Sequence, residues 1–396
     1  MKKGWKTEAL GDVLEKTETT DPTHFPQVEF DYIDVSSVSN ETLSIQQTQR
    51  LKGKDAPSRA RRLVAANDVL FATIRPTLRR IAIVPDELDK EVCSTGYLVL
   101  RPQPRVDYRF IFYFLQTEDF MGEMEKLQKG ASYPAVTDRD VRSQRIPVPP
   151  LAEQQRIVGV LDEALAGLAT AQAHAEKNLQ NARALFESHL QSVFTHCGKG
   201  WVDTVIGDCI RFIDYRGKTP VKTESGVRLI TAKNVKMGYL QETPKEFIAA
   251  ANYKSWMTRG IPNKGDVLFT TEAPLANIAQ LDTDENVAFA QRIIIMQADA
   301  AKLNSTFLKY LLLSQPAQHR IRTKGTGATV QGIKASLLKT IEISFPKKLE
   351  EQEQIVAKLD ALATETQCLE RLYEQKQVAL AALKKSLLHQ AFSGTL

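Results

Sequence analysis

The 396-residue sequence has few cysteines and no long apolar run. Its four cysteines include no C-x-x-C pair, which argues against a disulfide framework and a four-thiolate zinc site and fits a reducing compartment. No apolar run exceeds the six residues at 110–115, far short of the roughly 18 that cross a bilayer. Residues 1–6 lead into no apolar signal segment, so the sequence predicts a cytoplasmic protein without a membrane partner.

Signatures of catalysis are missing as well. The six histidines are dispersed, and the sequence contains neither H-E-x-x-H nor G-x-S-x-G nor the Asn-Pro-Pro-aromatic tetrapeptide of adenine methyltransferases. Residues 216–219 (R-G-K-T) match the end of a phosphate-binding loop, but Phe212 stands where the first glycine of that loop is required. The sequence therefore offers no convincing catalytic constellation, and it predicts neither catalytic residues nor a metal site.

Positive charge is unevenly distributed along the chain. Lys and Arg number 52 against 47 Asp and Glu, a formal net charge of only +5. Basic residues nevertheless gather at 50–80, 211–236 and 309–324, among Gly, Pro, Ser, Thr, Asn and Gln, the residue types that contact phosphates and base edges from loops. Such runs often only solvate a surface, but these occur in both halves of the chain and favour nucleic-acid binding. The predicted DNA contacts are Lys52, Lys54, Arg59, Arg61, Arg62, Arg79, Arg80, Arg216, Lys218, Lys233, Lys236, Arg320, Arg322 and Lys324.

An internal repeat organises the sequence. The string D-V-L-F at 68–71 recurs at 266–269, and L-x-E-Q at 151–154 recurs at 349–352, in each case followed by I-V and then L-D. The shift is half the chain, much longer than the 20 to 50 residues of a solenoid unit. The pattern is typical of a duplicated unit, which makes a pseudo-two-fold dimer within one chain.

Each copy ends in a long helical pattern. After Pro150 and after Pro346 the sequence is almost free of helix breakers, and its apolar residues step by three and four positions in a heptad seam. We expect an α+β protein with globular domains of mixed strands and helices at 1–150 and 197–348, and helices at 151–196 and 349–396. The two helices predict an antiparallel coiled coil, each a rod of roughly 65 Å.

Several strings closely resemble the specificity subunits of type I restriction-modification enzymes, and the resemblance covers the whole chain. Its best markers are the two junctions, I-P-V-P-P-L-A-E-Q at 146–154 and I-S-F-P at 343–346 followed by E-Q. The strings I-D-Y-R-G-K-T-P at 213–220 and H-Q-A-F-S-G at 389–394 also look like family strings. The second junction departs from the first because lysines at 347–348 replace prolines, which we interpret as a loop difference.

The resemblance implies that each globular domain is a target recognition domain that reads one half of a bipartite, asymmetric sequence in double-stranded DNA. The paired helices would act as a ruler that fixes the unread spacer. Two methyltransferase subunits, which methylate adenine with S-adenosylmethionine, and two ATP-dependent restriction subunits would be the partners. The resemblance also implies that this chain has no enzymatic activity of its own and holds no cofactor; S-adenosylmethionine, ATP and Mg would belong to the partner subunits.

Two alternatives remain open at this point. A coiled-coil protein-interaction scaffold without DNA specificity would explain the helices equally well but would give the duplicated basic loops no purpose. A nuclease or methyltransferase with unrecognised motifs would show activity as a purified chain. The target sequence, the spacer length and the base-contacting side chains do not follow from the sequence.

Overall fold

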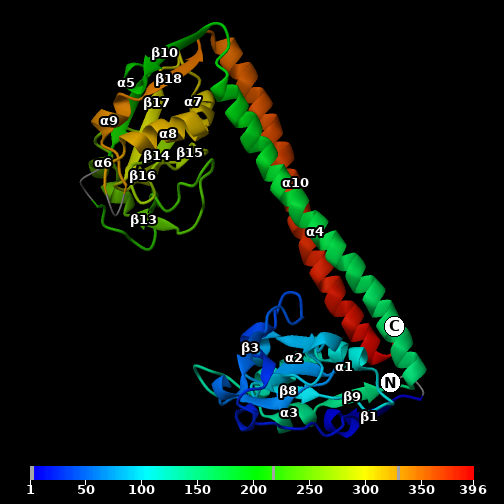
Figure 1. Cartoon of the computed structure of the whole chain (residues 1–396). Helices are drawn as coiled ribbons and strands as arrows, with labels where there is room; N and C mark the ends of the chain where they lie inside the picture. Colours follow the sequence, from blue (N-terminus) through cyan, green and yellow to red (C-terminus); the bar gives the residue numbers. More distant parts are fainter. Residues whose placement is uncertain (1–3, 216–218, 328–330) are drawn as a thin grey trace. The chain divides into compact units, whose positions relative to one another are not determined.

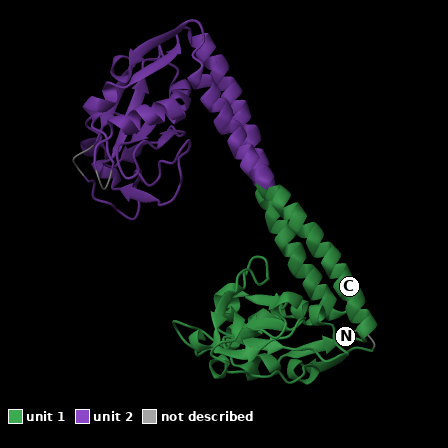
Figure 2. Ribbon diagram, viewed as in Figure 1, with its two compact units in different colours: residues 1–176, 374–396 green, residues 177–373 purple. Residues whose placement is uncertain are grey.

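The computed structural model describes residues 4–215, 219–327 and 331–396. The chain divides into two compact units: unit 1 comprises residues 1–176 and 374–396, and unit 2 comprises residues 177–373 (Figure 2). Each unit contains one mixed domain and part of each long helix, α4 (Leu151–Thr195) and α10 (Leu349–Ser393).

The domain of unit 1 alternates short strands with short helices (Figure 1). Its α-helices are α1 (Tyr108–Phe114), α2 (Glu118–Leu127) and α3 (Asp138–Arg142), and its 3-10 turns are η1 (Leu10–Val13), η2 (Pro22–His24), η3 (Val35–Ser37), η4 (Gly53–Asp55), η5 (Pro76–Leu78) and η6 (Asp86–Leu88). Its strands are β1 (Lys6–Ala9), β2 (Glu29–Ile33), β3 (Gln49–Lys52), β4 (Ala60–Leu63), β5 (Val69–Ala72), β6 (Ile81–Ile83), β7 (Val92–Ser94), β8 (Tyr97–Leu100) and β9 (Arg145–Val148).

The strands of unit 1 form two sheets and a closing pair. One sheet has the order β3-β2-β7-β4, in which β2 and β7 run parallel, and the other has the order β6-β5-β8. The first strand of the domain, β1, pairs antiparallel with β9, the strand that leads directly into α4. The beginning and the end of the domain are therefore joined where the long helix leaves it.

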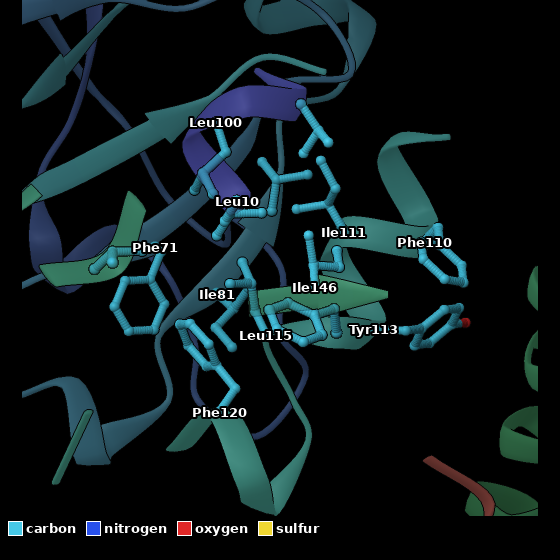
Figure 3. Packing of buried hydrophobic residues seen from close by; sticks show 14 of the residues in the cluster. Leu10, Phe71, Ile81, Leu100, Phe110, Ile111, Tyr113, Leu115, Phe120 and Ile146 are labelled. Atoms are coloured by element: carbon cyan, nitrogen blue, oxygen red, sulfur yellow. The ribbon is translucent and has the colours of Figure 1, made fainter. Parts of the chain in front are cut away.

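The core of unit 1 lies between the β6-β5-β8 sheet and the short helices (Figure 3). Strand β5 is buried along its whole length, as its uninterrupted apolar sequence predicts. Phe71 from this strand packs edge-on against Phe120 of α2, with ring centroids 5.3 Å apart. The same cluster includes Ile157, Val158 and Leu161 of α4, so the first turns of the long helix belong to the domain core.

The domain of unit 2 follows the same plan. Its helices are α5 (Ile206–Cys209), α6 (Tyr253–Trp256), α7 (Ser305–Leu313), α8 (Gln315–Lys324) and α9 (Ala335–Lys339), with the 3-10 turn η7 (Ala250–Asn252). Its strands are β10 (Trp201–Val205), β11 (Ile210–Asp214), β12 (Val227–Ile230), β13 (Glu246–Ile248), β14 (Val267–Thr270), β15 (Ile278–Gln280), β16 (Val287–Phe289), β17 (Ile293–Ala298) and β18 (Glu342–Pro346).

Sheet pairing confirms that the two domains are copies. Strand β12 runs parallel to β16, as β2 does to β7, and β14 pairs with β15 and β17, as β5 does with β6 and β8. Strand β10 pairs antiparallel with β18, which leads into α10. The copies differ at the sheet edges. Among the described residues, the first sheet of unit 2 has the order β13-β12-β16, without a counterpart of β4, and β11 extends the second sheet to the order β11-β17-β14-β15.

Helices α4 and α10 pack along each other in opposite directions (Figure 1). In unit 1, Arg156 near the start of α4 donates a hydrogen bond to the carbonyl of Leu396, at 2.9 Å. In unit 2, Arg183 further along α4 pairs with Glu370, earlier in the chain than Leu396, at 3.2 Å. Since positions rise along one helix as they fall along the other, the predicted antiparallel helix pair and the α+β class are confirmed.

The end of each long helix also packs on a domain. Phe392 of α10 lies 4.8 Å, centroid to centroid, from Phe110 of unit 1, and Phe194 of α4 lies 5.3 Å from Phe307 of unit 2. Each domain thus contacts the start of one helix and the end of the other. Within the described part of the chain, no helix has the length and hydropathy that a membrane span requires.

Candidate nucleic-acid interface

In unit 2, the loop at 231–244 follows the parallel strand β12 and is held by one buried asparagine. The Oδ1 atom of Asn234 accepts hydrogen bonds from the backbone N–H and the hydroxyl of Thr231, at 3.0 and 2.9 Å. Its Nδ2 atom donates to two backbone carbonyls further along the loop. The side chains of Lys233 and Lys236 project from this fixed backbone, and within the described residues neither has a hydrogen bond or an ion pair.

The same loop exposes apolar surface beside its lysines. Met237 is 45% exposed and Tyr239 is 59% exposed. Cations that meet phosphates and apolar groups that meet base edges, such as the thymine methyl, are the two kinds of contact that a DNA-reading loop combines.

The corresponding loop of unit 1 begins with a similar turn but carries different side chains. In both loops, the first backbone N–H after the strand donates to the side chain three residues later. Strand β2 leads into η3, where the backbone N–H of Asp34 donates to the hydroxyl of Ser37 at 3.0 Å. Three residues after the last strand residue, unit 1 has Ser36 where unit 2 has Lys233. A hydroxyl and an ammonium group at equivalent positions give the two loops different binding chemistry.

A second candidate surface of unit 1 depends on a glycine. A side-chain carbon on Gly53 in η4 would lie 2.2 Å from the carbonyl oxygen of Phe25 and 2.3 Å from that of Pro22, so only glycine allows η4 to approach η2 this closely. The contact is completed by the backbone N–H of Gly53, which donates to the carbonyl of Val28 at 2.9 Å.

This loop contact holds a group of exposed cations. The side chains of Lys52, Lys54 and Arg59 are exposed, and none has a hydrogen bond or ion pair with any described residue. Phe25 and Val28, on the partner loop, are 60% and 59% exposed. As in unit 2, unpartnered cations lie beside exposed apolar side chains on loops outside the core.

A third feature of unit 1 is the loop at 129–135, which is anchored by Arg75. The backbone N–H of Arg75 donates to the carbonyl of Pro134 at 2.7 Å, and its side chain donates to the carbonyl of Ser132 at 3.3 Å. Its guanidinium carbon lies 4.8 Å from the ring centroid of Tyr133, which is 72% exposed. A guanidinium stacked on an exposed ring is a surface suited to phosphate contact or base stacking.

Metal-ligand clusters and activated thiols are two features that catalysis can use. Across residues 4–215, 219–327 and 331–396, no three His, Cys, Asp or Glu side chains are grouped as metal ligands. Burial raises the pKa of Cys93 to about 12 and that of Cys209 to about 11, so both thiols are protonated at neutral pH. Neither buried cysteine is an activated nucleophile.

Comparison with known proteins identifies the family to which this two-domain chain belongs. The model of the type I restriction modification DNA specificity domain matches this chain twice, at residues 2–178 and 218–378, which together make up most of its length. The chain belongs to this family. One match falls in each copy of the repeat.

Individual relatives agree with that assignment. The HindI specificity subunit of Haemophilus influenzae is 26% identical over 162 residues, which cover 40% of this chain and 34%, or about a third, of that subunit. A chain from a structural study of complex assembly and conformational transition in a type I restriction-modification system is 28% identical, with a TM-score of 0.85 over 100% of this chain and 99% of its own length. The crystal structure of an HsdS subunit from Thermoanaerobacter tengcongensis is 27% identical, with a TM-score of 0.72 over 100% of this chain and 98% of that one. Nothing in these comparisons favours the scaffold alternative.

The structure sorts the predicted DNA contacts of this chain into three groups. Among described residues, the side chains without a hydrogen bond or ion pair are Lys52, Lys54, Arg59, Lys233, Lys236 and Arg322. Those already bound to other groups of the chain are Arg61, Arg62, Arg79, Arg80, Arg320 and Lys324. Arg216 and Lys218 lie outside the described residues. All of them remain predictions of DNA contact.

The second group has clear intrachain partners. Arg62 pairs with Asp138 at 2.8 Å, and Arg80 donates to the carbonyl of Val35 at 2.7 Å. Arg320 and Lys324 donate to backbone carbonyls in the segment at 340–342. Since these charges already contact other groups of the chain, the unpartnered residues of the first group are the better candidates for phosphate contact.

Sequence reasoning left some candidates out of the predicted site. Arg75 lies within the basic stretch at 50–80, but its neighbour Tyr133 is 58 residues away and gave no signal. Phe25, Met237 and Tyr239 are ordinary loop residues by sequence. Their exposure beside unpartnered cations became visible only in the folded chain.

Proposed function

We propose that this chain is the DNA-recognition subunit of a type I restriction-modification complex and reads a bipartite, asymmetric target. Each domain reads one half of the target, and the helix pair α4 and α10 keeps the two readings a fixed number of base pairs apart. The observation that carries the proposal is the duplication itself: two domains share sheet pairing and helix attachment, while their exposed loops differ in chemistry.

Recognition then has two parts. Unpartnered cations such as Lys54 and Lys233 bind phosphates, which gives affinity and orientation without sequence information. Neighbouring polar and apolar side chains contact base edges in the grooves, which gives specificity. Because Ser36 and Lys233 differ at equivalent positions, the two half-sites need not be alike.

The chain supplies recognition, and partner subunits supply chemistry. Two methyltransferase subunits would bind S-adenosylmethionine and methylate an adenine in each half-site, after the base is flipped out of the duplex. ATP-dependent restriction subunits, with Mg, would complete the assembly. This chain would hold no cofactor and would only position the partners on DNA.

The decisive experiment is a methylome of cells that express the cognate methyltransferase with and without this chain. A split motif with a fixed gap, methylated on adenine only when the chain is present, is expected. If no modification depends on the chain although it co-purifies with the methyltransferase, the proposal is wrong.

Helix length should set the spacer. Removing seven residues from each helix, at 172–178 and at the facing 375–381, preserves the heptad seam and shortens the pair by about 10 Å. Since one base pair rises about 3.4 Å, the preferred spacer should shorten by about three base pairs.

The matched control is an insertion of one heptad at the same two places, which should lengthen the spacer by the same amount. Both variants are read by methylation of duplexes that share the half-sites and differ only in the gap. An unchanged spacer in a folded variant would contradict the ruler role of the helices.

A further inference from the structure

The joint between α4 and its own domain contains a buried glutamine that makes three hydrogen bonds to the backbone. Gln154 is completely buried. Its Oε1 atom accepts from the backbone N–H of Asp107 at 2.9 Å, and its Nε2 atom donates to the carbonyls of Arg105 at 3.2 Å and Pro149 at 2.8 Å. One side chain therefore ties α4 to two other segments of unit 1.

The joint of α10 in unit 2 repeats this arrangement atom for atom. Gln352 is also completely buried. Its Oε1 atom accepts from the backbone N–H of Asn304 at 2.8 Å, and its Nε2 atom donates to the carbonyls of Lys302 at 2.9 Å and Pro346 at 2.7 Å. This is the glutamine of the repeated L-x-E-Q string.

The residues that the glutamines hold are the starts of domain helices. Asp107 is the N-cap of α1, and its side chain accepts from the backbone N–H of Arg109 at 2.8 Å. Asn304 is the N-cap of α7 and accepts from Thr306 and Phe307. Each long helix is thus fixed near its first turn to the first turn of a helix inside its domain.

A second contact holds each long helix eight residues further on. In unit 1, the hydroxyl of Tyr113 on α1 donates to Asp162 at 2.5 Å, and Arg109 donates to the same carboxylate at 2.7 Å. In unit 2, the hydroxyl of Tyr310 on α7 donates to Asp360 at 2.5 Å. The aspartates are those of the repeated L-D string.

Two contacts restrain a helix in a way that one cannot. A single contact leaves a hinge, whereas two contacts about 12 Å apart along the axis fix the direction of the rod relative to the domain. Between them, Ile157, Val158 and Leu161 are buried in the unit 1 core. Apolar packing holds the helix against the domain, and the hydrogen bonds select one orientation because a misaligned joint leaves buried polar groups unpaired.

We propose that Gln154 with Asp162, and Gln352 with Asp360, are positioning residues that make the chain selective for one spacer length. The proposal rests on the proposed function, in which the helix pair separates two DNA-reading domains. A DNA-contacting face about 20 Å from the joint moves about 3.5 Å when the joint rotates by about 10°, and this equals one base-pair step. A loose joint would therefore let a domain reach a half-site displaced by one base pair.

The experiment uses the full chain assembled with its methyltransferase subunits. Methylation rates are measured on duplexes whose spacer is native or one base pair shorter or longer. Gln154→Met and Gln352→Met remove the polar contacts while keeping the length of the side chain. The controls are Gln155→Met and Gln354→Met, because these neighbours are exposed and their side chains have no hydrogen bond among the described residues.

We expect each joint variant to lower the preference for the native spacer over its one-base-pair neighbours by about tenfold. Preference for the correct bases within each half-site should stay unchanged, which a merely destabilised domain would not achieve. The two control variants should keep the wild-type spacer preference.

Milder variants cover the case in which a glutamine variant fails to fold. Tyr113→Phe and Tyr310→Phe remove only the hydroxyl of the second contact, and we expect a loss of spacer preference of about threefold. If folded variants keep a sharp wild-type spacer preference, the proposal is overturned while the proposed function stands. If the wild-type complex itself ignores spacer length, the proposed function fails and this proposal fails with it.

Discussion

Replacing Lys52, Lys54 and Arg59 together with alanine should flatten the salt dependence of DNA binding. Each phosphate contact contributes about 0.9 to the slope of log affinity against log salt concentration. For three lost contacts, the wild-type complex should lose about 40-fold more affinity than the variant between roughly 50 and 200 mM salt. Fluorescence anisotropy with the assembled methyltransferase complex, on target and non-target duplexes, measures both slopes.

The effect should be similar on every sequence, because phosphate contacts carry no base information. Lys233→Ala with Lys236→Ala tests the same idea in unit 2 and should lower the slope by about 1.8. A variant that discriminates against one half-site instead, with an unchanged slope, would assign these side chains to base reading and contradict the phosphate role.

The matched control compares two arginines of the same segment. Arg59 is exposed and unpartnered among the described residues, whereas Arg62 pairs with Asp138 at 2.8 Å. Arg59→Met should lower the salt slope of DNA binding and leave the free energy of unfolding unchanged. Arg62→Met should lower the free energy of unfolding and leave the salt slope nearly unchanged. Equal slopes for both variants would show that exposure does not identify the phosphate contacts.

These two arginines illustrate what the sequence predicts and what it does not. The repeat, the long helices and the mixed domains follow from local periodicity and from strings that recur at a fixed offset, and the structure confirms them. Asp138, the partner of Arg62, is 76 residues away in the chain, and no local sequence pattern predicts that ion pair. A count of basic residues therefore predicts where charge gathers but not which charges are available to DNA.

The repeated L-x-E-Q and L-D strings also show what the sequence alone does not predict. Their recurrence marked the two helix junctions in the sequence. The contacts of Gln154 and Asp162 involve α1 and its N-cap Asp107, which precedes Gln154 by 47 residues, so the roles of both residues became apparent only from the packed joint. Recurrence shows that a position is duplicated, and only contacts show what it does.

The two copies have also diverged inside their cores, at a buried carboxylate that follows the same turn. In unit 1, Asp68 is 1% exposed and forms a two-point contact with Arg101, at 2.9 and 2.8 Å. In unit 2 the equivalent Asp266 is 8% exposed and accepts a hydrogen bond from Gln297 at 2.8 Å. Asp266 also accepts from the backbone N–H of Asn263 at 2.8 Å, so one carboxylate has a full counter-charge and the other has only neutral donors.

Arg101→Met should therefore destabilise unit 1 strongly. It leaves a buried carboxylate without its counter-charge, which costs about 3–5 kcal/mol when a buried pair is broken. Since the Arg101 side chain is 23% exposed and water can replace part of the contact, we expect about 3 kcal/mol. Gln297→Met should destabilise unit 2 by only about 1.5–2 kcal/mol, the loss of one hydrogen bond to a charged group.

The two units should also differ in their response to pH. Burial raises the pKa of Asp266 above its ordinary value of 3.8, so the folded unit 2 binds a proton more readily than the unfolded chain. Unit 2 consequently loses stability as the pH rises through the interval between 3.8 and the raised value. Gln297→Met should widen this interval, because the lost hydrogen bond favours the charged form, and Asp266→Asn should abolish it.

Hydrogen exchange measures these effects separately within one chain. The amides of β5 and β8 report on unit 1, and those of β14 and β17 report on unit 2. We expect Arg101→Met to lower the protection of the β5 and β8 amides against exchange. Gln297→Met should lower the protection of the β14 and β17 amides by a smaller amount. If either variant lowers protection in both units, the duplicated domains unfold together. If the two variants lower protection equally, the charged partner of Asp68 stabilises its unit no more than the neutral partner of Asp266 does.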